Sequence, residues 1–137
     1  MKTNLEEAYK RNLRCLLDTN FLLTCAKQKI DLFEFLNNEG FQILIPKQVL
    51  SELEGILISK KKAKFKDDAA LSIKIIEKNN FILIDIEGKT VDKGIINYAN
   101  KNKDVIIATL DKEIQKKTKN KKLIIKGKKM LEIVWVI

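Results

Sequence analysis

Histidine is absent from the sequence, and cysteine, proline and glycine are scarce, with two Cys, one Pro and five Gly among 137 residues. Without histidine the chain has no serine–histidine or cysteine–histidine nucleophilic site, and two cysteines cannot by themselves make a zinc site of the usual kind. Any catalysis must therefore use carboxylates, hydroxyls and lysines. Few Gly and Pro also mean little sign of disorder or of a linker, so residues 1–137 are expected to form a single domain.

Long apolar runs are missing as well. The longest, such as 41–45 and 81–84, are far shorter than the roughly 20 residues that cross a bilayer. The start of the chain carries charges of both signs and lacks the apolar segment of a secretion signal. These absences predict a cytoplasmic protein that does not contact a membrane. Cys15 and Cys25 stand among apolar neighbours, which suits buried, reduced thiols better than a disulfide.

Lysine is what the chain has in excess. Lys and Arg number 27 against 18 Asp and Glu, which gives a formal net charge of +9. Such an excess raises the concentration of polyanions near a protein, so nucleic acid is the partner that the charge favours. Genome composition or adaptation to high temperature produces the same excess, and charge alone does not decide between these explanations.

Apolar runs of strand length alternate with segments of helical periodicity. This alternation predicts an α/β fold in three layers, with a central, mostly parallel sheet of about five strands and helices on both faces. The expected strands are 13–17, 41–45, 81–86 and 105–108, followed by peripheral strands at 123–125 and 133–136. The apolar neighbours of Trp135 in the last strand predict that its side chain is part of the core.

The expected helices are 21–27, 30–37, one that follows Pro46 and runs through Leu57, one opened by Asp67 and Asp68, 92–99, and a short one that begins at Asp111. Five lysines lie between residues 59 and 66, where the apolar pattern is interrupted. This cluster is interpreted as an exposed loop or helix end.

Acidic residues follow the predicted strands, where open parallel sheets place their sites. Asp18 follows the first strand, Asp92 lies after the third at a helix start, Asp111 follows the fourth, and Glu52 lies on the helix after the second. Carboxylates that converge about 4 Å apart repel by roughly 4 kcal/mol at an effective dielectric constant near 20, so such a cluster needs a cation. Mg²⁺ and Mn²⁺ prefer oxygen ligands. Helix capping is the alternative role for the three aspartates, and helical geometry does not choose between Glu52 and Glu54.

Four strings, in this order, resemble the motifs of PIN domains. They are Leu16-Leu17-Asp18-Thr19-Asn20, Ser51-Glu52-Leu53, Thr90-Val91-Asp92 and Ala108-Thr109-Leu110-Asp111. The resemblance covers roughly residues 13 to 126 and is greatest to archaeal PIN proteins similar to the endonucleases of small-subunit ribosomal RNA processing. It implies a divalent-metal-dependent endoribonuclease. Its catalytic, metal-binding acids would be Asp18, Glu52, Asp92 and Asp111, supported through hydrogen bonds by Asn20 and Thr109.

One position departs from the pattern, because many relatives carry paired acids in the third motif and Lys93 follows Asp92 here. The departure keeps open a catalytically silent PIN fold that binds RNA or a ribosome-assembly partner. A toxin ribonuclease of the VapC type, which would require an antitoxin, is the other alternative. The resemblance also makes a homodimer plausible.

Single-stranded or structured ribosomal RNA is the expected partner, and phosphate contacts are the expected role of the basic side chains. Lysines crowd the C-terminal third of the chain, Lys122 among them, and a solvated face is their ordinary explanation. The RNA-contacting candidates are Lys93, Lys112, Lys116 and Lys117.

Overall fold

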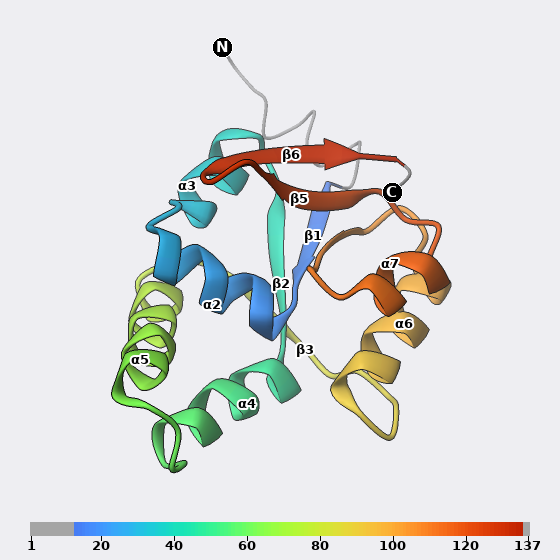
Figure 1. Cartoon of the computed structure of the whole chain (residues 1–137). Helices are drawn as coiled ribbons and strands as arrows, with labels where there is room; N and C mark the ends of the chain where they lie inside the picture. Colours follow the sequence, from blue (N-terminus) through green and yellow to red (C-terminus); the bar gives the residue numbers. More distant parts are fainter. Residues whose placement is uncertain (1–12, 136–137) are drawn as a thin grey trace.

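The computed structural model describes residues 13–135. Six strands form one sheet in the order β3-β2-β1-β4-β5-β6 (Figure 1). The first five are parallel to their neighbours, and only the pair β5 and β6 is antiparallel. The predicted α/β class and mostly parallel sheet are therefore confirmed, and the six strands correspond to the four central and two peripheral strands that were expected. The strands are β1 (Arg14–Leu17), β2 (Gln42–Pro46), β3 (Ile82–Ile84), β4 (Ile106–Ala108), β5 (Lys122–Lys126) and β6 (Met130–Val134).

Helices cover both faces of the sheet. Figure 1 shows α2, α4 and α5 on one side of β1 and β2, and α6 and α7 on the other. None of the helices within residues 13–135 is long and apolar enough to cross a membrane. The helices are α2 (Thr19–Gln28), α3 (Leu32–Asn38), α4 (Lys47–Leu57), α5 (Ala63–Glu77), α6 (Val91–Lys101) and α7 (Lys112–Lys117).

Alternation along β1 builds two separate cores. Cys15 and Leu17 point to the face that α2, α3, α4 and α5 cover, whereas Leu16 points to the face covered by α6 and α7. Both faces of the strand are buried because side chains alternate along a strand and helices lie on each side. Cys15 and Cys25 are buried and free, as predicted.

The order of the strands changes direction beside β1. The chain runs outward from β1 to β2 and β3, then returns to place β4 against the opposite edge of β1. The two strands are joined just beyond their carboxyl ends, where the amide of Asp18 donates to the carbonyl of Ala108 at 3.0 Å. Open α/β sheets carry ligand sites at such a switch point, because the connections leave the two strand ends on opposite faces.

Two predicted features on the outer parts of the fold were wrong. Helix α5 begins at Ala63 and not at Asp67, so Lys64 and Lys66 belong to its first turns. The residues before Asp67 extend the helix because Ala and Lys favour helical conformation and Phe65 packs against the core. Trp135 is 67% exposed. It follows the edge strand β6, and Lys121 Nζ lies 4.5 Å from the centroid of its ring.

Lys122 also differs from its expected place on a solvated face. Its side chain is 2% exposed, and Nζ donates to the carbonyls of Thr118 and Asn120. Burial lowers the pKa of this lysine. Lys122 therefore satisfies carbonyl groups in the loop that joins α7 to β5, and it is not available to RNA.

Candidate functional site

Asp18 occupies the switch point between β1 and β4 and is 4% exposed. Its Oδ1 accepts from the amide of Thr19 at 2.8 Å, and its Oδ2 accepts from Thr109 Oγ1 at 2.8 Å. The first bond makes Asp18 the N-cap of α2. Capping and a site role are thus combined in one carboxylate, whose orientation is fixed by two donors.

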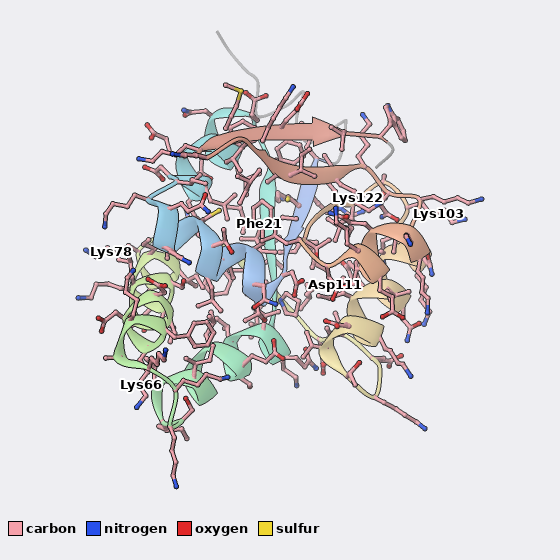
Figure 2. The ribbon with its side chains drawn as sticks, viewed as in Figure 1. Phe21, Lys66, Lys78, Lys103, Asp111 and Lys122 are labelled. Atoms are coloured by element: carbon pink, nitrogen blue, oxygen red, sulfur yellow. The ribbon has the colours of Figure 1, made fainter. Side chains whose placement is uncertain are left out.

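Thr109, directly after β4, connects Asp18 to Asp111. Its hydroxyl oxygen accepts from the amide of Asp111 at 3.1 Å while the hydroxyl donates to Asp18. Asp111 Oδ1 in turn accepts from the amides of Glu113 and Ile114 at 2.8 and 3.0 Å, which caps α7. In Figure 2, Asp111 lies by the start of α2, with α6 and α7 beside it. Thr109 therefore links Asp18 and Asp111 through its hydroxyl group, and the resemblance to PIN domains implies a supporting role for this residue.

Glu52 reaches the same place from α4. Thr19 Oγ1 donates to Glu52 Oε1, so the first residue of α2 orients this carboxylate. Glu52, and not Glu54, is thereby placed beside Asp18. The supporting role of Thr19 was missed, although the residue stands within the Asp18-Thr19-Asn20 string. Asn20 is exposed, and among residues 13–135 its side chain has no hydrogen-bond partner, so the support expected from it comes from Thr19 instead.

Asp92 lies in the first turn of α6 and does not cap it. Thr90 is the N-cap, and its Oγ1 accepts from the amide of Lys93 at 3.2 Å. A close approach of two backbone segments holds this helix start in place. A Cβ atom added to Gly88 would lie only 2.5 Å from the amide nitrogen of Gly94, so the contact requires glycine.

The four acids act on one another electrostatically. Burial raises the pKa of Asp18 to about 6, and the charges of Asp92 and Glu52 add to the increase, whereas the hydrogen bonds from Thr109 and Thr19 oppose it. The pKa of Asp92 is also raised, first by desolvation and then by the charge of Asp111 and hydrogen-bonding contact with that carboxyl, with smaller effects from Glu52 and Glu113. Four segments of the chain thus contribute to one acidic cluster.

Glu113 is a fifth acid that sequence reasoning missed. It lies two residues after Asp111 in the first turn of α7, and its charge contributes to the raised pKa of Asp92. Lys117 neutralises part of that charge through an ion pair of 2.8 Å. The signal was present in the sequence, because an acid two positions after a helix cap falls on the same end of the helix.

The cluster has the donor chemistry of a site for a hard divalent cation. Asp18, Glu52, Asp92 and Asp111 supply carboxylate oxygens, and none of them forms an ion pair with a Lys or Arg of residues 13–135. Within that part of the chain, however, no three acidic or thiol side chains are arranged to hold a metal as they stand. Glu52 and Asp92 are exposed, so their side chains can turn inward toward the buried Asp18. The residues fit the cation, but the site is not fully assembled in advance.

Exposed lysines surround the acidic cluster on the side of α6 and α7. Lys93 follows Asp92 on α6, and Lys112 and Lys116 lie on α7. Lys117 is exposed as well, although it is paired with Glu113. All four candidates for RNA contact are therefore accessible from solvent.

Comparison with known proteins agrees with this architecture. Residues 15–127 match the family described as PIN like domain. The chain is 33% identical over 126 residues to ribonuclease VapC4 of Methanocaldococcus jannaschii, a match that covers 88% of this chain and 95% of that protein. The fold of this chain is similar to that of the PIN domain endonuclease Utp24, with a TM-score of 0.71 and 24% sequence identity. The match covers 90% of this chain and 95% of the Utp24 chain. On the family match and on the identity to VapC4, the chain belongs to the PIN-like domain family.

Proposed function

We propose that this chain is a divalent-metal-dependent endoribonuclease that hydrolyses RNA phosphodiester bonds. The observation that carries the proposal is the convergence of Asp18, Glu52, Asp92 and Asp111 from four segments at the switch point of the sheet, where Asp18 and Asp92 have raised pKa values. Strongly perturbed carboxyl groups at a ligand-binding edge are typical of catalytic sites. RNA is proposed as the substrate because the relative VapC4 is a ribonuclease.

The chain's own residues hold the carboxylates in place for this chemistry. Thr109 and the amide of Thr19 fix both oxygens of Asp18, and the hydroxyl of Thr19 orients Glu52. Bound Mg²⁺ or Mn²⁺ would supply Lewis-acid polarisation of the phosphoryl group and a water of lowered pKa. No protein nucleophile is needed, which agrees with the absence of histidine.

We propose cleavage within a strand, and not from an end, because part of the acidic cluster is exposed. Glu52 and Asp92 are exposed at the sheet edge, so an RNA strand can cross the acidic cluster without threading an end into a closed pocket. Lys93, Lys112 and Lys116 are exposed on α6 and α7, and we propose that they contact phosphates of that strand. A role in ribosomal RNA processing is the setting that we propose for this activity.

Cleavage of labelled single-stranded RNA in Mg²⁺ or Mn²⁺ tests the proposal. Cleavage should be internal and should stop on addition of EDTA. Glu52→Gln and Glu54→Gln form a matched pair, because both acids are exposed on α4 and only Glu52 meets Thr19. Glu52→Gln should reduce the rate at least about 100-fold, the scale of removing a group that stabilises a transition state, whereas Glu54→Gln should cleave at the wild-type rate. Equal losses in the two variants would contradict the assigned site.

Two other functions have specific support. Identity to VapC4 favours a toxin ribonuclease, which would stop the growth of cells that express it without an antitoxin. Lys93 beside Asp92 favours a silent RNA-binding fold, because a cation there opposes metal binding. RNA binding without cleavage in either metal ion would support the silent fold and reject the nuclease.

A further inference from the structure

A cleft of about 360 Å³ lies between α2 and the start of α5. Asn20, Thr24 and Lys27 line it from α2, at the spacing of three and four residues that places side chains on one face of a helix. Lys62 and Lys64 line it from the start of α5. Asn20, which lines the cleft, is two residues from Asp18, the N-cap of α2, so one end of the cleft lies near the acidic cluster.

Its charge is opposite to that of the acidic cluster. Three lysines line the cleft together with one acid, Asp68, which Lys64 partly neutralises at 3.6 Å. Lys27 and Lys62 form no ion pair with any residue of 13–135. Further lysines from the loop between α4 and α5 surround it, and Figure 2 shows Lys66 at this end of α5. Lys27 and Lys62 therefore place two positive charges without ion-pair partners in a cleft that Leu23 and Phe65 also line.

We propose that this cleft binds the phosphate backbone of the RNA on one side of the scissile bond. The inference rests on the proposed function, since it concerns the path of the same substrate. Carboxylates repel phosphates, so a strand that crosses the acidic cluster needs cationic surface on its flanks. Lys93, Lys112 and Lys116 provide it on the side of α6 and α7, and the cleft provides it on the side of α2 and α5.

The lining favours RNA over an acidic protein segment and indicates how the strand is bound. The cleft lies near Asp18, past which the proposed function takes an RNA strand, so the phosphate backbone of that strand is the occupant that we propose. Lysine ammonium groups bind phosphates as point charges and read no bases. Phe65 is half-buried, so base stacking contributes little. Binding in the cleft should therefore depend on RNA length and salt, and little on sequence.

The test measures RNA binding in the Asp18→Asn background, where cleavage does not interfere. Lys27→Ala with Lys62→Ala removes the two unpaired charges and leaves the Lys64–Asp68 pair intact. Lys74→Ala with Lys78→Ala is the matched control, because it removes two exposed lysines from the opposite end of α5, where Figure 2 shows Lys78. Circular dichroism establishes that both double variants are folded.

Single-stranded RNAs of about 4 and about 16 nucleotides span the range of site sizes for such surfaces. For the longer RNA the cleft variant should bind about fivefold more weakly at low salt, as two exposed ion pairs allow. The slope of log affinity against log salt should become shallower by about 1.4, because each single-strand phosphate contact contributes about 0.7. The shorter RNA should lose less affinity, and the control variant should match the parent for both lengths.

Equal losses in the cleft and control variants, or an unchanged salt slope, would overturn the proposal. The result is independent of catalysis. If the wild-type protein fails to cleave RNA but the cleft variant still loses more affinity for the longer RNA, the nuclease proposal fails and the proposal that the cleft binds RNA stands. If the wild-type protein cleaves while the cleft variant binds long RNA normally, the cleft proposal alone fails.

Discussion

Replacement of Asp18 by Asn should stabilise the metal-free protein while it abolishes cleavage. The carboxyl group is 4% exposed, and burial raises its pKa from the ordinary value of 3.8 to about 6. Since each tenfold change in proton affinity corresponds to about 1.4 kcal/mol, ionised Asp18 costs about 3 kcal/mol at pH 7. Asn is neutral and remains a good N-cap for α2.

Part of the stability gained by removing the buried charge is lost in Asp18→Asn, because an amide has only one acceptor oxygen. The carboxylate accepts from both the Thr19 amide and the Thr109 hydroxyl, and one of these bonds must weaken or reverse, at a cost of about 1 kcal/mol. The expected net gain for Asp18→Asn is therefore about 2 kcal/mol at pH 7. A site residue that destabilises the fold is a common cost of function.

The stability that Asp18→Asn gains over the wild-type protein should increase from pH 4 to pH 7. Because the folded chain binds the Asp18 proton more tightly than the unfolded chain, the stability due to the neutral carboxyl is present below about pH 4 and is lost as the pH rises through about 6. The difference between variant and wild type should accordingly be small at pH 4 and largest at pH 7.

Urea denaturation in EDTA at pH 4 and pH 7 measures this difference. Asp67→Asn, which removes an exposed carboxylate on α5, is the control and should change the free energy of unfolding by less than about 0.5 kcal/mol. The reasoning is refuted if Asp18→Asn is destabilised at pH 7, or if its effect is the same at both pH values.

Two further substitutions test the parts that hold the acids. Thr109→Val should lower the free energy of unfolding by about 2 kcal/mol, because it removes the buried hydroxyl that joins Asp18 to the amide of Asp111; chemical denaturation that gives the wild-type value would contradict this role. Gly88→Ala should destabilise the fold by at least about 1 kcal/mol and reduce cleavage, since its Cβ would lie 2.5 Å from the amide nitrogen of Gly94 and would displace the helix start that carries Asp92. Wild-type melting and cleavage together would show that the close approach is unimportant.

The sheet was predictable because its strands are buried on both faces. Runs such as Leu16-Leu17 and Ile43-Leu44-Ile45 are continuously apolar, which distinguishes central parallel strands from amphipathic elements. The start of α5 was not predictable in the same way. Its first residues are mostly lysines, whose periodicity carries no burial signal, and the packing of Phe65 decides the boundary.

The aspartates of the candidate site were predictable from their positions after strands, whereas Glu52 and Thr109 were expected only from the resemblance to PIN domains. Asp18 and Asp111 follow neighbouring parallel strands, so the topology places both at the same edge of the sheet. That Thr19 and not Asn20 contacts Glu52 depends on the rotation of α2 about its axis, which tertiary packing sets.

The burial of two side chains was predicted wrongly: Lys122 was expected to be exposed and Trp135 to be buried. Lys122 is buried because two carbonyls in the loop after α7 require a donor, a need that no residue pattern expresses. Trp135 is exposed because it lies just beyond the edge strand β6. A sequence pattern indicates only the average tendency of a residue type to be buried, whereas the burial of these two side chains depends on their particular surroundings in the fold.

The pairing of β1 with β4 has a consequence for protein synthesis. Asp18 emerges from the ribosome about ninety residues before Thr109, the residue that binds it, as the 91-residue separation of their hydrogen bond shows. A nascent chain that stops short of β4 has neither Thr109 nor Asp111. If the protein cuts RNA, the translating ribosome and its messenger are spared until β4 and the residues that follow it have been made.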